Sequence, residues 1–309
     1  MTADRPPGLR EAGFFWARLL LVLLPAAIVL IPVAALGSLT GWWALLAAPL
    51  VAPCYFPILV LELSLLARWV PPVEVGLFDD QRDLAGYQRA MRQFRHRDVL
   101  EGTIYAFGLD GWLSAWPSLM RALLRAFGAD VGQAVAVAPR VELTLPSHLQ
   151  LGPGAYLGWG SYLSPVLQLS LGHLLIEPVA VGAGSFVGAG CRLGPGSRLG
   201  VACILGAEST LAGQIRLGSE VRVRGMLRAD RDVEIGGGSM LGYGVTLHRG
   251  CRLGFAVRLG SHVTIGRGAR VGDDCRLGNH VTVAAGACLP ARTRVPGGTH
   301  LPASDFPSP

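Results

Sequence analysis

The sequence predicts an all-β second half, coiled into a triangular parallel β-helix, with a pair of transmembrane helices in front of it. Every sixth residue from Leu145 to Leu301 is Leu, Ile or Val, and Ala229 is the single exception among 27 such positions. Gly directly follows 15 of the first 26 of these residues. The third observation is that two long apolar stretches precede residue 71.

The six-residue period fits neither an α-helix, which repeats about every 3.6 residues, nor a flat strand, which repeats every 2. It is typical of a chain that turns a corner every six residues, so that three short strands close one coil of about 18 residues. The stretch 145–300 then gives between eight and nine stacked coils. The aliphatic residue points to the axis, and we expect the Gly after it to supply the backbone freedom of a tight corner.

A second inward column lies two residues before each aliphatic position and has to hold small side chains. It includes Cys191, Cys203, Cys251 and Cys275. We interpret these cysteines as core residues. The chain has no C-x-x-C pair, so we expect neither a zinc site nor a disulfide framework.

Residues 1–70 are predicted to form a tail and two membrane-spanning helices. The stretches Phe14–Leu36 and Gly41–Val70 are each long enough for a span, which needs about 20 apolar residues. The joint, residues 37–40, is uncharged, whereas arginines flank the pair on both sides. The positive-inside rule places both ends, and the β-helix, on the cytoplasmic side of the inner membrane.

Residues 71–130 form the connector, and 131–309 the β-helix. A polar helix is expected over 83–100, and the amphipathic segment 111–127 suits a membrane surface. Residues 131–142 already show the six-residue rhythm, offset by two from the main frame, which predicts a first, irregular coil.

The net charge of +6 comes from arginines dispersed at outward positions. No aromatic residues alternate with them in the manner of a base-stacking surface, so we expect no nucleic-acid partner. Contact with solvent or with anionic lipid headgroups explains the charge better.

Three consecutive corners between Leu163 and Val181 lack Gly, which predicts a loop that leaves the prism while the frame resumes in phase. Around this loop the runs RALLRAFGADVGQAVAV, HLQLGPGAYLGWGSYLS and GHLLIEPVAVGAGSFVGAGCRLGPGSRLG resemble the hexapeptide-repeat acyltransferase superfamily. The similarity is to colanic-acid-type acetyltransferases, and more to the membrane C-terminal region of poly-lysine-synthetase-type peptide synthetases.

The resemblance implies a left-handed β-helix, a homotrimer, and acyl-CoA, in particular acetyl-CoA, bound in a groove between prisms without a metal. It implies a His in this loop as general base, and His173 is the only one there. The family's loop-start His is replaced here by Ser164-Pro165. The expected function is a membrane-anchored acyltransferase with a small-molecule or lipid-linked acceptor. The alternative is a non-catalytic scaffold or trimerisation module at the membrane.

Three further histidines stay open. His262 and His280 are 18 residues apart in the same phase, so they should stack on one outer face, as surface residues or as part of a metal or acceptor site. His248 follows Leu247 at a corner. A zinc hydratase of the γ-carbonic-anhydrase type needs three His ligands, and the pattern around His248 does not provide them.

Overall fold

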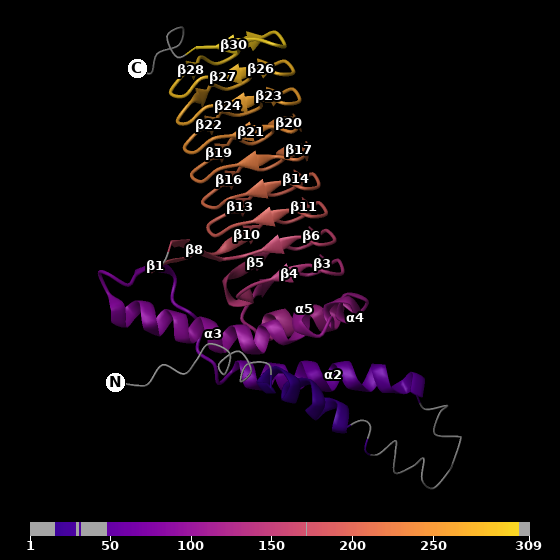
Figure 1. Cartoon of the computed structure of the whole chain (residues 1–309). Helices are drawn as coiled ribbons and strands as arrows, with labels where there is room; N and C mark the ends of the chain where they lie inside the picture. Colours follow the sequence, from indigo (N-terminus) through magenta and orange to yellow (C-terminus); the bar gives the residue numbers. More distant parts are fainter. Residues whose placement is uncertain (1–15, 29–30, 32–47, 171, 303–309) are drawn as a thin grey trace.

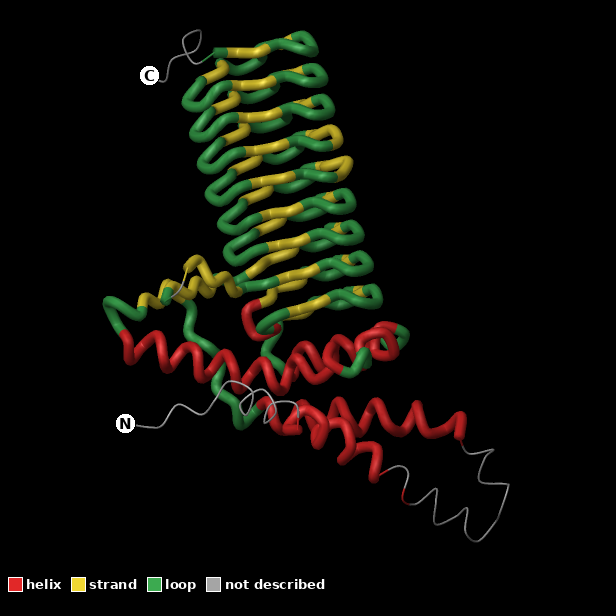
Figure 2. The backbone as a smooth tube through the Cα atoms, viewed as in Figure 1, coloured by secondary structure: helices red, strands yellow, loops and turns green. Residues whose placement is uncertain are grey.

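A computed structural model describes residues 16–28, 31, 48–170 and 172–302. It shows a column of stacked coils standing on a layer of helices (Figures 1 and 2). The parallel β-helix predicted from the period is confirmed, with three sheets of nine strands each in the described part of the chain. Nine coils at about 4.8 Å give a column about 38 Å long between its first and last coil.

Each coil contributes one strand to each of three faces. The first face comprises β2 (Asp130–Val131), β5 (Leu149–Leu151), β10 (Val179–Val181), β13 (Arg198–Leu199), β16 (Arg216–Leu217), β19 (Glu234–Ile235), β22 (Arg252–Leu253), β25 (Arg270–Val271) and β28 (Cys288–Leu289). The second comprises β3 (Ala136–Val137), β6 (Tyr156–Leu157), β11 (Phe186–Val187), β14 (Ile204–Leu205), β17 (Arg222–Gly225), β20 (Met240–Tyr243), β23 (Arg258–Leu259), β26 (Arg276–Leu277) and β29 (Arg294–Val295). The third comprises β4 (Glu142–Leu143), β7 (Tyr162–Leu163), β12 (Arg192–Leu193), β15 (Thr210–Leu211), β18 (Arg228–Ala229), β21 (Thr246–Leu247), β24 (Thr264–Ile265), β27 (Thr282–Val283) and β30 (His300–Leu301).

Two rows of inward-pointing side chains form the core of the β-helix. One row holds the axial aliphatic residues, and the other holds the small residues two positions before them. Axial residues such as Leu157, Val187 and Leu205 are fully buried, and so are Cys191 and Cys203 two residues before an axial position. The six cysteines are free thiols. Burial raises the pKa of Cys251 to about 12, so this thiol stays protonated in the core.

The corner glycines serve a different purpose from the one predicted. Gly182 follows the axial Val181, and its φ is not among the positive values. A Cβ on Gly182 would collide with the carbonyl group of Gly200 in the next coil. The positive φ occurs two residues later, at Gly184 (+63°) or, one coil on, at Ala202 (+55°). The residue after most axial positions is therefore small because neighbouring coils touch there.

The first coil has the predicted offset of two residues. Its axial residues are Val131, Val137 and Leu143, and a short 3₁₀ helix over Pro146–His148 supplies the extra length before Leu151. Leu145, which fits the main period, lies in this irregular segment with φ +45° and not on the axis.

A β-hairpin leaves the column between β7 and β10, as the missing corner glycines predicted. It consists of β8 (Val166–Ser170) and β9 (His173–Ile176), and β1 (Gly76–Asp79) pairs antiparallel with β9. Axial residues Leu163 and Val181 are 18 apart instead of 6, so 18 − 6 = 12 residues are inserted. Because 12 is two periods, the frame resumes unchanged.

The helical layer contains a helix over residues 16–28, α2 (Ala48–Ala67), α3 (Leu84–Ala106), α4 (Asp110–Ser114) and α5 (Pro117–Ala126). The apolar side of α5 is buried at Met120, Leu123 and Leu124, in one cluster with the first coil and with Leu59 and Leu63 of α2. The amphipathic segment 111–127, expected at a membrane surface, thus contains the helix that closes the end of the β-helix core.

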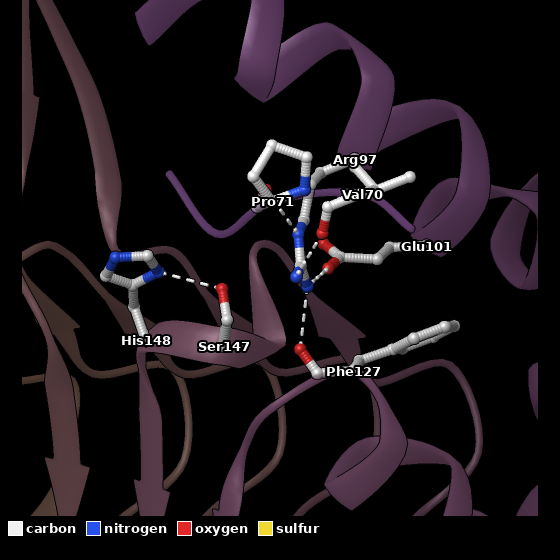
Figure 3. A network of polar contacts seen from close by, with 7 residues as sticks. All are labelled: Val70, Pro71, Arg97, Glu101, Phe127, Ser147 and His148. Atoms are coloured by element: carbon white, nitrogen blue, oxygen red, sulfur yellow. Dashed lines mark hydrogen bonds and ion pairs between the residues drawn. The ribbon is translucent and has the colours of Figure 1, made fainter. Parts of the chain in front are cut away.

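Arg97 of α3 ties this layer together (Figure 3). Its guanidinium donates to the carbonyl oxygens of Phe127 (2.7 Å), Val70 (3.0 Å) and Pro71 (3.3 Å), and to Oε1 of Glu101 at 3.0 Å. The ends of α2 and α5 are therefore held by one buried side chain. Burial raises the pKa of Glu101 to about 7, although the contact with Arg97 acts in the opposite direction.

Among the described residues, no helix has both the length and the apolarity that a membrane span needs. The described part of the chain therefore does not support the transmembrane hairpin predicted over 14–36 and 41–70. The joint of that hairpin, residues 37–40, lies outside the described residues.

Candidate active site

The projecting hairpin places His173 beside a carboxylate. In the pairing of β1 with β9, Asp79 is the register partner of His173, and Asp79 Oδ2 lies 3.3 Å from His173 Nε2. The side chain of His173 is 33% exposed and that of Asp79 is 16% exposed. A partly exposed imidazole next to a more enclosed carboxylate is an arrangement suited to proton transfer.

Asp79 is kept ionised by its surroundings. Its Oδ1 accepts a hydrogen bond from the backbone N–H of Gln81 at 2.9 Å. That bond is the main cause that lowers the pKa of Asp79, and the charges of His173 and Arg82 lower it further. An ionised carboxylate can orient the imidazole and stabilise the imidazolium that forms when the ring takes a proton.

His173 lies toward the outer end of the hairpin. Ile176 is three positions further along the strand, which is about 10 Å at the rise of a β-strand. Ile176 is fully buried in a small cluster with Leu174, Leu145 and Val73, which fixes the base of the hairpin. The strands β1 and β8 lie beside the column in Figure 1, and β9, which begins at His173, pairs with both of them.

A groove of about 580 Å³ begins at the base of the hairpin and runs along the first face. Glu177 and Pro178 line its lower end. Arg198 and Arg216 line it on adjacent coils, and Arg252 lines it two coils further on. Glu234, between the last two, lies 3.3 Å from Arg216 and 3.6 Å from Arg252. The groove offers guanidinium groups over about four coils. The carboxylate of Glu234 compensates the charges of Arg216 and Arg252.

Ser164, at the place of the family's loop-start His, has a structural role. The residue is buried, and its hydroxyl donates to the carbonyl oxygen of Val166 at 2.7 Å. This contact fixes the first turn of the hairpin.

A second histidine–aspartate pair lies on the column itself. His248 Nδ1 is 3.1 Å from Asp230 Oδ2 in the preceding coil. Both residues directly follow an axial residue on the third face, where Gly194, Ala212 and Gly266 occupy other coils. Two large polar residues in a column of small ones were a signal that the sequence contained, because their spacing is one coil.

His262 and His280 stack as predicted. Their ring centroids are 5.1 Å apart and the ring planes are inclined by 12°. They stand at the corner between the second and third faces, away from the hairpin's corner. Among the described residues no group of three or more His, Cys, Asp or Glu side chains is placed to hold a metal ion.

No protein-family model matches this chain, and no curated protein matches it either. Similar solved structures include a UDP-N-acetylglucosamine acyltransferase from Campylobacter jejuni, with 14% identity, a TM-score of 0.37, and coverage of 52% of this chain and 66% of that one. LpxA from Acinetobacter baumannii has 13% identity, a TM-score of 0.28, and coverage of 56% and 66%. A point mutant of perosamine N-acetyltransferase from Caulobacter crescentus, in complex with CoA and GDP-perosamine, has 18% identity, a TM-score of 0.18, and coverage of 62% and 61%.

This chain thus spans less than two thirds of the length of each of these structures. At these identities and TM-scores the likeness assigns no activity, substrate or assembly to this chain.

Proposed function

We propose that the protein is an acyltransferase that uses acyl-CoA, with His173 as its general base and Asp79 as the group that orients it. The observation that carries the proposal is the 3.3 Å contact between the two side chains on the hairpin. The acceptor is a small molecule or a lipid-linked compound with a hydroxyl or amine.

In the proposed step, His173 takes the proton from the acceptor as its oxygen or nitrogen attacks the thioester carbonyl. The bond from the acceptor to the acyl carbon forms, and the bond from that carbon to sulfur breaks. The imidazolium returns its proton to the CoA thiolate, so that the free thiol leaves. Asp79 stabilises the imidazolium between these two transfers.

We further propose that the donor lies along the groove on the first face. The guanidinium of Arg198 has no ion pair among the described residues and would contact a donor phosphate. Because His173 projects from its own column, the site would be completed in a homotrimer, where the hairpin of one prism reaches the groove of its neighbour.

Association with the cytoplasmic face of the inner membrane belongs to the proposal as well. The helix over 16–28 exposes Trp16, Leu20, Leu23 and Leu24, and Trp69 after α2 is 86% exposed. Exposed aromatic and aliphatic side chains next to Arg68 suit a membrane interface. The helix over 16–28 and α2 lie at the end of the molecule opposite the last coil (Figure 2).

The test is the release of CoA from acetyl-CoA by the full chain in detergent, with amines and alcohols as acceptors. We expect His173→Ala to lower turnover by roughly 10² to 10⁴, the usual contribution of a general base, with unchanged affinity for acetyl-CoA. Asp79→Asn should lower turnover less. The matched control is His248→Ala, which removes the other histidine of a histidine–aspartate pair and should leave turnover intact.

Full activity in His173→Ala together with loss in His248→Ala would move the site to the column. Failure of the wild-type chain both to bind acetyl-CoA and to release CoA would instead favour the scaffold function, for which the stacked coils alone suffice.

A further inference from the structure

The upper part of the second face carries a row of three arginines. Arg258, Arg276 and Arg294 are register partners in the adjacent strands β23, β26 and β29. Their Cα atoms therefore repeat at the coil spacing of about 4.8 Å, and the outer two are about 10 Å apart. All three side chains are exposed.

These arginines line a shallow groove of about 620 Å³. Gly260, Gly278 and Pro296, each directly after an axial residue, line it as well, so that no long side chain stands beside the arginines there. The lining of this groove contains no carboxylate. Among the described residues none of the three guanidinium groups forms an ion pair.

On the first face, by contrast, two of the arginines have a carboxylate partner. There, Glu234 lies between Arg216 and Arg252 and contacts both. On the second face, like charges stand directly opposite one another on three adjacent strands, which is destabilising. An anion between them would offset that cost.

The stacked pair stands at the next corner. His262 lies two residues after Gly260, and His280 lies two residues after Gly278. Their rings repeat with the same coil spacing as the arginines. The two histidines are not among the residues that line the groove.

We propose that this row is a binding site for a chain of phosphates, a di- or triphosphate. Guanidinium groups bind phosphate oxygens in a bidentate manner, and three of them in line over about 10 Å match a linear anion with several phosphates better than a single phosphate. The row ends below at Met240, the register partner of Arg258, which limits the ligand to a small molecule. The inference does not depend on the proposed acyl transfer.

The experiment is calorimetric titration of the full chain with sodium tripolyphosphate, with ADP and with inorganic phosphate, at one low ionic strength. We expect tripolyphosphate to bind at least ten times more tightly than inorganic phosphate. Arg276→Gln, which removes the middle guanidinium, should weaken tripolyphosphate binding at least tenfold. The matched control is Arg222→Gln, in the same column but separated from the row by Met240, and it should leave binding unchanged.

The two possible sources of the phosphate chain are separated by ADP. If ADP binds at least as tightly as tripolyphosphate and Arg276→Gln weakens that binding, the ligand of the row is a nucleotide. Weaker ADP binding would assign a free oligophosphate. No binding of either compound, or equal losses in Arg276→Gln and Arg222→Gln, would overturn the proposal. Because all these arginines are exposed, both variants should melt like the wild type, which is checked first.

Discussion

At the scale of single residues, each corner of the prism needs a small or permissive residue for two separate reasons. Gly182 avoids contact with the backbone of the next coil, because a Cβ there would collide with the Gly200 carbonyl group. Gly184, two residues on, has φ +63° and open space around it. Steric exclusion acts at the first position and backbone conformation at the second.

This difference predicts that Gly182→Ala destabilises the protein more than Gly184→Ala. Overpacking of a closely packed site costs about 1–3 kcal/mol or more, whereas the left-handed conformation costs a non-glycine residue about 1–2 kcal/mol. Ala202 already adopts that conformation one coil on. The melting temperatures of the two variants test this prediction. If Gly184→Ala lowers the melting temperature as much as Gly182→Ala or more, backbone conformation governs both positions.

Glu101 is predicted to make stability depend on pH. Burial raises its pKa to about 7, above the value of 4.5 expected in the unfolded chain. The folded state therefore holds this proton more tightly, and the stabilisation it contributes is full below pH 4.5 and is lost as pH rises to about 7.

Glu101→Gln removes that titration while its amide oxygen can still accept from Arg97. Melting temperatures of both proteins between about pH 4.5 and pH 8 are the measurement. We expect the variant to gain stability relative to the wild type as pH rises through this range. A constant difference between the two would show that Glu101 does not titrate there.

Sequence reasoning proposed His173 as a site residue but did not connect it with Asp79. Asp79 lies 94 residues away along the chain (173 − 79) and outside the repeat, so no spacing connects the two. The pair His248–Asp230 was within reach, because its members occupy one column of the repeat. The prediction for the corner glycines was wrong in its cause, since close approach between coils is not encoded in a local preference.

At the scale of elements, the hairpin β8–β9 is an insertion that the column does not need. Ser164 and Glu177 stand at its two ends, and joining them leaves Leu163 and Val181 six residues apart. The period alone hid the insertion, because Leu169 and Leu175 continue it although Leu175 lies on the hairpin. The absence of corner glycines was the better signal.

Deletion of residues 165–176 should therefore leave the β-helix folded. The deletion removes His173 and the contacts of Leu174 and Ile176 in the small cluster at its base. We expect a far-ultraviolet circular dichroism spectrum close to that of the wild type, with no measurable acyl transfer. Loss of the β-helix spectrum would show that the hairpin stabilises the second and third coils, and retained activity would exclude His173.

At the scale of the whole molecule, the helices close one end of the column (Figure 1). The groove opens along the first face of the column. In the proposed arrangement the helical layer contacts the membrane. The hairpin, near the lower end of the column, then stands close to the bilayer, within reach of a lipid-linked acceptor. The sequence predicted the column in detail because every coil repeats the same contacts, whereas the helical layer depends on contacts that do not repeat, such as those of Arg97.

We propose His173 as the base of an acyl-CoA site beside the hairpin, and a structure of the full chain with acetyl-CoA bound tests this claim most directly. We expect the thioester carbonyl carbon next to His173, with space between them for an acceptor hydroxyl or amine, and the donor phosphates on the first face near Arg198. A thioester bound instead beside His248 and Asp230, or in the groove of Arg276, would contradict the claim.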